Sequence, residues 1–522
     1  MWERAKGRER EFRFSILFTA QDVGNYLNSD EEIRHAAAWC KDRGFTRIFL
    51  ETFRNGYSPE TERLARARDL FRQLRIDVSG CVAPTGMGIP SNQCNAVSNY
   101  EAPETLTECR RLFEGAASIF DEILIDGFLY TDDDSEASLK ARGDQSWMEY
   151  RCDLMLRVCR EAILGPARLI NPRVEVMLKY PPWYDLYPLQ GCNVETQTDL
   201  FDHIWAQTPT LGEAPQRRSF PGAAFFLLRW LADIGPGKMG GGCIDACEAS
   251  PDECVEQARQ IILGGAKEAL LHHFGGLQNE TGAVNAARLL EEIPNLFLLA
   301  EAVAEASPAG ILAPQIPNSD PGGEPHIYSR LSLLGWPLAP LSRIDVSYPA
   351  VLFAAPSWQS DIFPAQFDEF LEEKKPIALT GNLRHMLQVK GIHFPESIAI
   401  LEIPQETQRL LELNSALLQS WRDRLLYPLG LRVSGPAGVS LYLFDNGLLA
   451  VENFLNQSVE FLVECRQPLD DQEREHARKT AFALPNEHSV RTSIAPNGVQ
   501  FVLDPHSLAV VKLAQQRFQW RR

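Results

Sequence analysis

The chain lacks a long apolar run. No stretch of its 522 residues approaches the ~18 consecutive apolar residues that a membrane helix requires, and the first apolar run, Phe14–Phe18, is too short for a secretory signal. Basic charge is also scarce, with 51 Lys and Arg against 69 Asp and Glu and a net charge of −18. Such acidity disfavours nucleic acid and anionic membranes as partners. We expect a cytoplasmic protein whose acidity either suits a neutral or cationic partner, such as a neutral sugar, or only maintains solubility.

Cofactor and metal motifs are missing too. No Gly-x-Gly-x-x-Gly opens a helix after the first strand, although a dinucleotide-binding sheet usually has one. The 11 cysteines are odd in number, and several fall in helical patterns as small buried residues, which is typical of a reducing compartment. Cys243, Cys247 and Cys254 lie near His272 and His273 in the sequence, but their spacing matches no strong zinc pattern. We therefore predict no metal and no cofactor.

Short apolar strands alternate with amphipathic helices through the first three-fifths of the chain. About eight such units in this length predict a (β/α)₈ TIM barrel, an α/β fold. A doubly wound sheet is the alternative. The expected strands are Arg13–Thr19, Arg47–Phe53, Asp77–Pro84, Glu122–Tyr130, Val174–Tyr180, His203–Thr208, Met239–Ile244 and Glu268–Phe274.

The last two-fifths of the chain change pattern twice. A turn-rich segment, Asn318–Glu324, indicates a domain boundary. After it, strands at Ala350–Ala355 and Pro376–Thr380 flank a helix at Pro364–Glu373, which predicts a small α/β domain. The final segment is all-β, with a hairpin turn at Asp445–Gly447. We expect a catalytic barrel over 1–315, a small α/β domain over 325–430 and a β-sandwich over 431–522.

Three carboxylates follow barrel strands at the end where TIM-barrel enzymes carry their active residues. Asp126 follows the fourth strand, and Asp245 and Glu248 follow the seventh. Glycoside hydrolysis needs two carboxyl groups, one as acid and one as nucleophile or base. Asp126 is the strongest candidate, because burying a carboxylate at a strand end costs free energy that a function would justify. The structural alternatives are a loop cap or a lysine pair for Asp126 and a place near a helix N-terminus for Glu248.

The strand ends also carry groups that suit sugar binding. Aromatic rings stack on apolar sugar faces, and ordinary loop packing is the alternative for each ring. Only one of two adjacent histidines after the eighth strand can face the barrel, because strand residues alternate. The predicted substrate-binding residues are Glu51, Lys179, Tyr180, Trp183, Tyr184, Trp205, His272 and His273.

Two of these residues carry charges that permit a second role. Lys179 either bonds a sugar hydroxyl or lowers the pKa of Asp126. Glu51 either binds a sugar hydroxyl or pairs with Arg54 or Arg47 at the strand end. The sequence leaves both choices open.

The order of parts resembles a known group. Leu333–Pro337, Ala350–Ala355 and Pro376–Gly381 are similar to the trimerisation domain of family 42 β-galactosidases and their uncharacterised glycosyl-hydrolase-like relatives. The barrel motifs Lys179–Tyr184 and Gly240–Asp245 look like those of the uncharacterised relatives. The resemblance implies a glycoside hydrolase that assembles as a homo-oligomer through its middle domain. In family 42 the fourth strand carries a Glu after an Asn, whereas this chain carries Asp126.

A glycoside hydrolase acting on an oligosaccharide or glycoside is therefore the favoured function. One alternative is a barrel that binds carbohydrate without catalysis. The other is a barrel lyase, epimerase or isomerase with Lys179 or a histidine as base. The sequence leaves the sugar, the linkage and the stereochemistry open.

Overall fold

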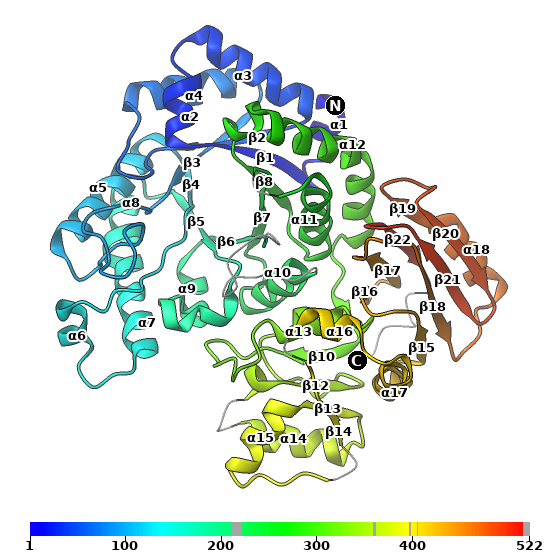
Figure 1. Cartoon of the computed structure of the whole chain (residues 1–522). Coiled ribbons are helices and arrows are strands. Elements are labelled where there is room, and N and C mark those ends of the chain that lie inside the picture. The colour runs from blue at the N-terminus through cyan, green and yellow to red at the C-terminus, as the bar shows by residue number, and fades with distance from the viewer. Residues whose placement is uncertain (210–221, 248, 359–361, 396–397, 405, 515–522) are drawn as a thin grey trace. The chain divides into compact units, whose positions relative to one another are not determined.

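The computed structural model describes residues 1–209, 222–247, 249–358, 362–395, 398–404 and 406–514. Eight parallel strands close into a barrel in sequence order, so the predicted TIM barrel is confirmed (Figure 1). The strands are β1 (Arg13–Phe18), β2 (Arg47–Glu51), β3 (Asp77–Val82), β4 (Glu122–Ile125), β5 (Glu175–Tyr180), β6 (His203–Gln207), β7 (Met239–Asp245) and β8 (Glu268–His272).

Helices follow the barrel strands and lie on the outside (Figure 1). Capping residues fix where they begin: Ser29 and Glu32 form a capping box at α3, and Gly44 ends that helix in the left-handed conformation. A short helix that the sequence pattern did not predict, α2 (Ala20–Tyr26), directly follows β1. The other helices that follow barrel strands include α3 (Asp30–Arg43), α4 (Thr61–Gln73), α5 (Pro103–Ile119), α7 (Trp147–Val158), α9 (Val194–Leu200), α11 (Pro251–Leu263) and α12 (Glu280–Val303).

Strand alternation divides the barrel interior into layers. The middle layer takes one buried residue from each strand: Leu17, Phe49, Cys81, Leu124, Met177, Trp205, Cys243 and Leu270. Two residues earlier along the strands lies a polar floor, where Arg47 bonds Ser79 and pairs with Glu122 and Glu268. Two residues later along the strands come Glu51, Asp126, Lys179, Gln207, Asp245 and His272. We call these six residues the mouth layer.

Trp205 lies in the middle layer, so the prediction that it binds sugar at the mouth is wrong. Its side chain is 1% exposed, and its ring meets the Phe49 ring edge-on at 5.7 Å. Neighbouring glycines make room for the indole, because a Cβ on Gly241 would lie 2.4 Å from it. The glycines that interrupt the apolar pattern of the seventh strand therefore leave space for the Trp205 ring.

Contacts divide the chain into two compact units. The first comprises 1–218, 234–262 and 266–293 and contains the barrel strands; the second comprises 219–233, 263–265 and 294–522. Most of α10 (Ala223–Ile234), which the sequence pattern assigns to the barrel, belongs to the second unit. No helix among the described residues is long and apolar enough to cross a membrane.

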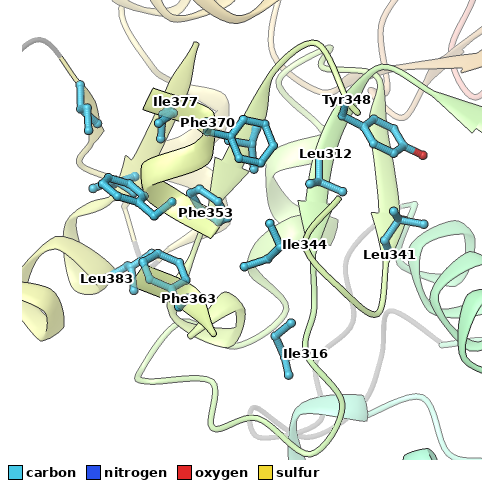
Figure 2. Packing of buried hydrophobic residues seen from close by; sticks show 14 of the residues in the cluster. Leu312, Ile316, Leu341, Ile344, Tyr348, Phe353, Phe363, Phe370, Ile377 and Leu383 are labelled. Carbon is cyan, nitrogen blue, oxygen red and sulfur yellow. The ribbon is translucent and has the colours of Figure 1, made fainter. Parts of the chain in front are cut away.

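A five-stranded parallel sheet forms the first part of the second unit, in the order β11-β10-β12-β13-β14. Figure 2 shows its core, where Phe363 and Phe370 of α14 (Phe363–Glu372) pack against Phe353. The Phe353 and Phe363 rings meet edge-on at 5.0 Å. The strands are β10 (Ile311–Pro314), β11 (Leu338–Leu341), β12 (Val351–Phe353), β13 (Ile377–Thr380) and β14 (Ala399–Leu401).

Antiparallel sheets form the C-terminal part, as predicted. One has the order β15-β18-β21-β20, and the other has the order β19-β22-β17-β16-β9. The predicted hairpin joins β16 to β17. The strands are β9 (Pro308–Ala309), β15 (Leu431–Ser434), β16 (Val439–Phe444), β17 (Leu448–Asn453), β18 (Val459–Cys465), β19 (Phe482–Leu484), β20 (Val490–Ala495), β21 (Gly498–Leu503) and β22 (Leu508–Lys512).

Candidate active site

A buried ionic cluster occupies one side of the mouth layer. Asp126 directly follows β4 and is 1% exposed; its backbone N–H continues the strand ladder by donating to Val82 O at 2.9 Å. Its carboxylate contacts Lys179 Nζ through one oxygen and the Arg54 guanidinium through the other. Lys179 also donates to Gln207 Oε1 at 3.0 Å. The cluster therefore links the ends of β4, β5 and β6.

Glu51 is the second carboxylate of this cluster. It is fully buried and accepts hydrogen bonds from Arg54 Nε at 2.8 Å and Arg54 Nη2 at 2.8 Å. The backbone N–H of Ala20 donates to it at 2.8 Å. Of the two roles open in the sequence, the structure therefore shows the Arg54 pair. Arg54 joins Glu51 to Asp126, and sequence reasoning had treated it only as a partner of Glu51.

The surrounding charges and burial shift the pKa values of Asp126 and Glu51 in opposite directions. Burial raises the pKa of Asp126, but Lys179 and Arg54 outweigh it and hold that pKa well below its usual range. Burial raises the pKa of Glu51, and Arg54 only partly opposes this. Burial lowers the pKa of Lys179, but the Asp126 charge raises it above the ordinary value. Asp126 is therefore ionised and Lys179 protonated at neutral pH.

The remaining members of the mouth layer come from β7 and β8. Burial lowers the pKa of His272 to about 3, against an opposing effect of Asp126, so its imidazole is neutral at pH 7. Its Nδ1 is buried and finds no hydrogen-bond partner within the described ranges. Asp245 is half-buried and accepts the Cys247 N–H at 3.3 Å. Glu248 lies outside the described residues.

The structure also places Tyr180, a predicted substrate-binding residue, away from the mouth. It follows Lys179 on β5, so alternation turns it away from the barrel interior. Its hydroxyl lies 3.1 Å from Thr198 Oγ1, and its ring stacks on Tyr187 at 5.5 Å. Tyr180 therefore packs outside the barrel rather than at the mouth.

Two further aromatics lie in the segment after β5 and are largely covered. Trp183 is 4% exposed and Tyr184 is 2% exposed. The Trp183 Nε1–H donates to Gln190 Oε1 at 2.6 Å. Its ring meets the Phe128 ring edge-on at 5.1 Å. Trp183 thus supports a neighbouring ring, which is the packing role that the sequence left open.

Phe128 is a site residue that sequence reasoning missed. It is half-buried, and its ring centroid lies 5.0 Å from Lys179 Nζ. It sits two residues after Asp126 with a φ of +66°, next to Gly127 with a φ of +67°. A bulky residue rarely adopts this conformation, and such strain often occurs at functional sites. Gly127, already visible in the sequence, was the only signal.

His273 packs against a helix. Of the two histidines, of which only one was expected to face the barrel, His272 belongs to the mouth layer, and His273, which follows the last residue of β8, contacts α2. Its Nδ1 lies 2.7 Å from Oδ2 of Asp22, a buried residue of α2. Among the described residues, no group of three or more His, Cys, Asp or Glu is arranged to hold a metal ion.

An eight-stranded barrel with a carboxylate-bearing mouth and an antiparallel C-terminal part is the architecture of a TIM-barrel protein, a class to which many glycoside hydrolases belong. The comparison with known families gives the particular group. The chain belongs to the family described as "probable glycosyl hydrolase": the catalytic domain of that family matches residues 2–308, and its C-terminal domain matches residues 430–513. The chain therefore carries the catalytic and C-terminal domains of a probable glycosyl hydrolase. The family match neither supports nor contradicts the resemblance to family 42 β-galactosidases.

One solved structure shares the fold, and a second protein shares part of the sequence. The α-L-fucosidase isoenzyme 2 from Paenibacillus thiaminolyticus shares the fold with a TM-score of 0.63 and 11% identity, over 96% of this chain and 100% of that one. An uncharacterised protein of Saccharolobus solfataricus is 24% identical over an alignment of 224 residues, and the alignment covers 38% of this chain. That match spans only 37% of the relative's length.

Proposed function

We propose that this glycoside hydrolase cleaves its substrate with Asp126 as the ionised carboxylate and Asp245 as the proton donor. The observation that carries the proposal is the buried Asp126 carboxylate held between Lys179 and Arg54. Two carboxyl groups with separate protonation states are what glycoside hydrolysis requires. Glu248, three residues after Asp245, is the alternative donor.

The ionised state of Asp126 suits it to face the positive charge that develops at the anomeric carbon. Lys179 and Arg54 each take one carboxylate oxygen, and each oxygen keeps a further lone pair. Asp126 then acts as nucleophile, or as the base that activates water, depending on the space between the two carboxylates. Asp245 belongs to the same layer three strands further round the barrel, which is why we assign it the second role.

Other residues of the site would bind the sugar. The neutral His272 is suited to exchange a hydrogen bond with a sugar hydroxyl through Nδ1. The half-buried Phe128 ring offers an apolar face beside the ionic cluster. The substrate class is a glycoside or an oligosaccharide, and α-L-fucosides belong in the first screen because a fucosidase shares the fold.

The test is hydrolysis of a panel of aryl glycosides, including fucosides, galactosides and mannosides, followed by Asp126→Asn on the best substrate. We expect turnover to fall by about 10³-fold or more. Glu292→Gln, which breaks a buried pair with Arg259 outside the mouth layer, controls for loss of stability. Asp245→Asn and Glu248→Gln then identify the donor. Undiminished turnover in Asp126→Asn would refute the assignment.

A lyase, epimerase or isomerase is the second candidate. The protonated Lys179 does not suit the role of base, whereas the neutral His272 does. Proton exchange from a sugar carbon into deuterated water, lost in His272→Gln, would favour this candidate over hydrolysis. Binding without any turnover would instead indicate a carbohydrate-binding barrel.

The homo-oligomer expected from the sequence stays a prediction. Light scattering at working concentrations tests it. A monomer throughout would contradict it.

A further inference from the structure

A cysteine, a histidine and an aspartate gather beside the mouth layer from three separate segments. Cys247 follows β7, His273 follows β8 and Asp22 lies on α2. Cys247 is half-buried, and its sulfur lies 3.3 Å from the carbonyl oxygen of His272. None of the three is an assigned reacting group of the proposed hydrolysis.

Asp22 fixes the His273 ring. Its carboxylate is buried, and Oδ2 contacts both the Thr19 N–H at 3.1 Å and His273 Nδ1 at 2.7 Å. The Gly276 N–H also approaches Nδ1, but at 3.4 Å this contact is weak. A carboxylate at this position favours the proton on Nδ1 and leaves Nε2 to accept a proton from another group.

The sulfur and the second ring nitrogen line the same small space. A methyl group on Gly276 would lie 2.2 Å from Cys247 Sγ and 3.1 Å from His273 Nε2. Only a residue without a side chain fits there. The thiol therefore lies near an imidazole that a buried carboxylate orients, and these are the groups that activate sulfur nucleophiles.

We propose that Cys247 is a reactive thiol, activated by His273 and Asp22, that forms mixed disulfides with low-molecular-weight disulfides. His273 Nε2 takes the thiol proton, and the thiolate attacks one sulfur of the incoming disulfide. The S–S bond breaks, a new one forms to Cys247, and the departing thiolate takes the proton back from His273. No net oxidant is needed, because the incoming disulfide is reduced as Cys247 is oxidised.

Other charges face this thiol. Asp245 accepts the Cys247 N–H and places a negative charge near the sulfur, whereas the buried Asp22 carboxylate contacts the His273 ring. Cys254 of α11 is nearby, and burial raises its pKa to about 12, so it stays a neutral thiol. The proposal goes beyond the glycosidase function, because disulfide exchange requires no hydrolysis.

The chain supplies its own control in Cys94, which is more exposed than Cys247. The experiment treats the full-length protein with glutathione disulfide at pH 6 and quantifies both mixed disulfides by peptide mass spectrometry. Lowering a thiol pKa by about 1.5 raises its thiolate fraction by about 30-fold and reduces its nucleophilicity by about five-fold, a net gain of about six-fold. We therefore expect Cys247 to react about six-fold faster than Cys94.

Variants separate activation from exposure. His273→Gln should bring the Cys247 rate down to that of Cys94 or below, with the Cys94 rate unchanged. Asp22→Asn, which loses only the carboxylate that orients the ring, should reduce the Cys247 rate as well. The proposal is overturned if Cys247 reacts no faster than Cys94 in the unmodified protein, or if the ratio of the two rates survives both variants. Because the readout is labelling, a failed hydrolysis assay leaves this result intact.

Discussion

Lys179→Met is the most informative change to the ionic cluster, because it removes one charge and keeps an unbranched side chain. Lys179 is 3% exposed and contacts an Asp126 carboxylate that is equally buried. Breaking a buried pair by removing one partner costs about 3–5 kcal/mol, because a buried charge is left uncompensated. Arg54 still contacts Asp126 in the variant, so we expect the lower end, about 3 kcal/mol.

Asp126→Asn combined with Lys179→Met completes the test. The double variant removes both charges, so its loss should be smaller than the sum of the single losses by up to about 3 kcal/mol. Hydrogen exchange of peptides from β4 and β5, followed by mass spectrometry, measures the barrel unit separately from the rest of the chain. Strict additivity of the two single losses would refute the reasoning.

Acid unfolding should also distinguish Lys179→Met from the unmodified protein. The pKa of Asp126 is depressed in the folded protein, so its contribution to stability is present above its unfolded pKa of ~3.9 and is lost as pH falls through the folded value. Without Lys179 the folded pKa rises toward its usual range. Acid unfolding should therefore begin at a higher pH than in the unmodified protein. If acid unfolding of Lys179→Met begins at the same pH as that of the unmodified protein, Lys179 is not what keeps Asp126 ionised.

Further predictions concern the layer below and the opposite side of the mouth. Trp205→Ala should cost about 3–5 kcal/mol by opening a cavity in the middle layer, and urea unfolding of the barrel measures this; a loss under about 1 kcal/mol would contradict the core position. Burial lowers the pKa of His272 from 6.5 to about 3 in the folded protein. The contribution of the neutral His272 to folding stability is therefore complete above about pH 6.5 and declines as pH falls toward 3. His272→Gln should remove this decline and flatten the dependence of stability on pH. Thermal unfolding across that range checks it, and an unchanged slope would count against a buried neutral imidazole.

The sequence predicted the barrel because each strand is short, apolar and followed by a helix, and these signals are local. The same two-residue period also places Asp126, Lys179 and Asp245 in one layer, since each lies two positions after a middle-layer residue. Applied strictly, it would also have excluded Tyr180, which directly follows an inward-facing lysine. The strand period alone therefore fixes the positions of Trp205 and Tyr180 away from the mouth.

The residues that sequence reasoning missed lie beyond the strands. Arg54, Phe128 and Asp22 occupy loops or a short helix, where no period fixes the direction of a side chain. Their positions depend on contacts between segments far apart in the chain, such as Arg54 with Asp126. A single sequence contains the residues for such contacts but no repeating signal of which ones meet.

The polar floor of the barrel also bears on how the chain assembles during synthesis. Arg47 pairs with Glu122 of β4 and with Glu268 of β8, which lies 221 residues further along the chain. Until β8 emerges from the ribosome, Arg47 has only one of these carboxylates and β1 has an open edge. Pairing across such a separation is slow to form, because the entropy cost of closing the loop comes before the contact stabilises the fold. Closure of this barrel is thus a late event, and the growing chain must keep an unpaired strand from meeting its neighbours until then.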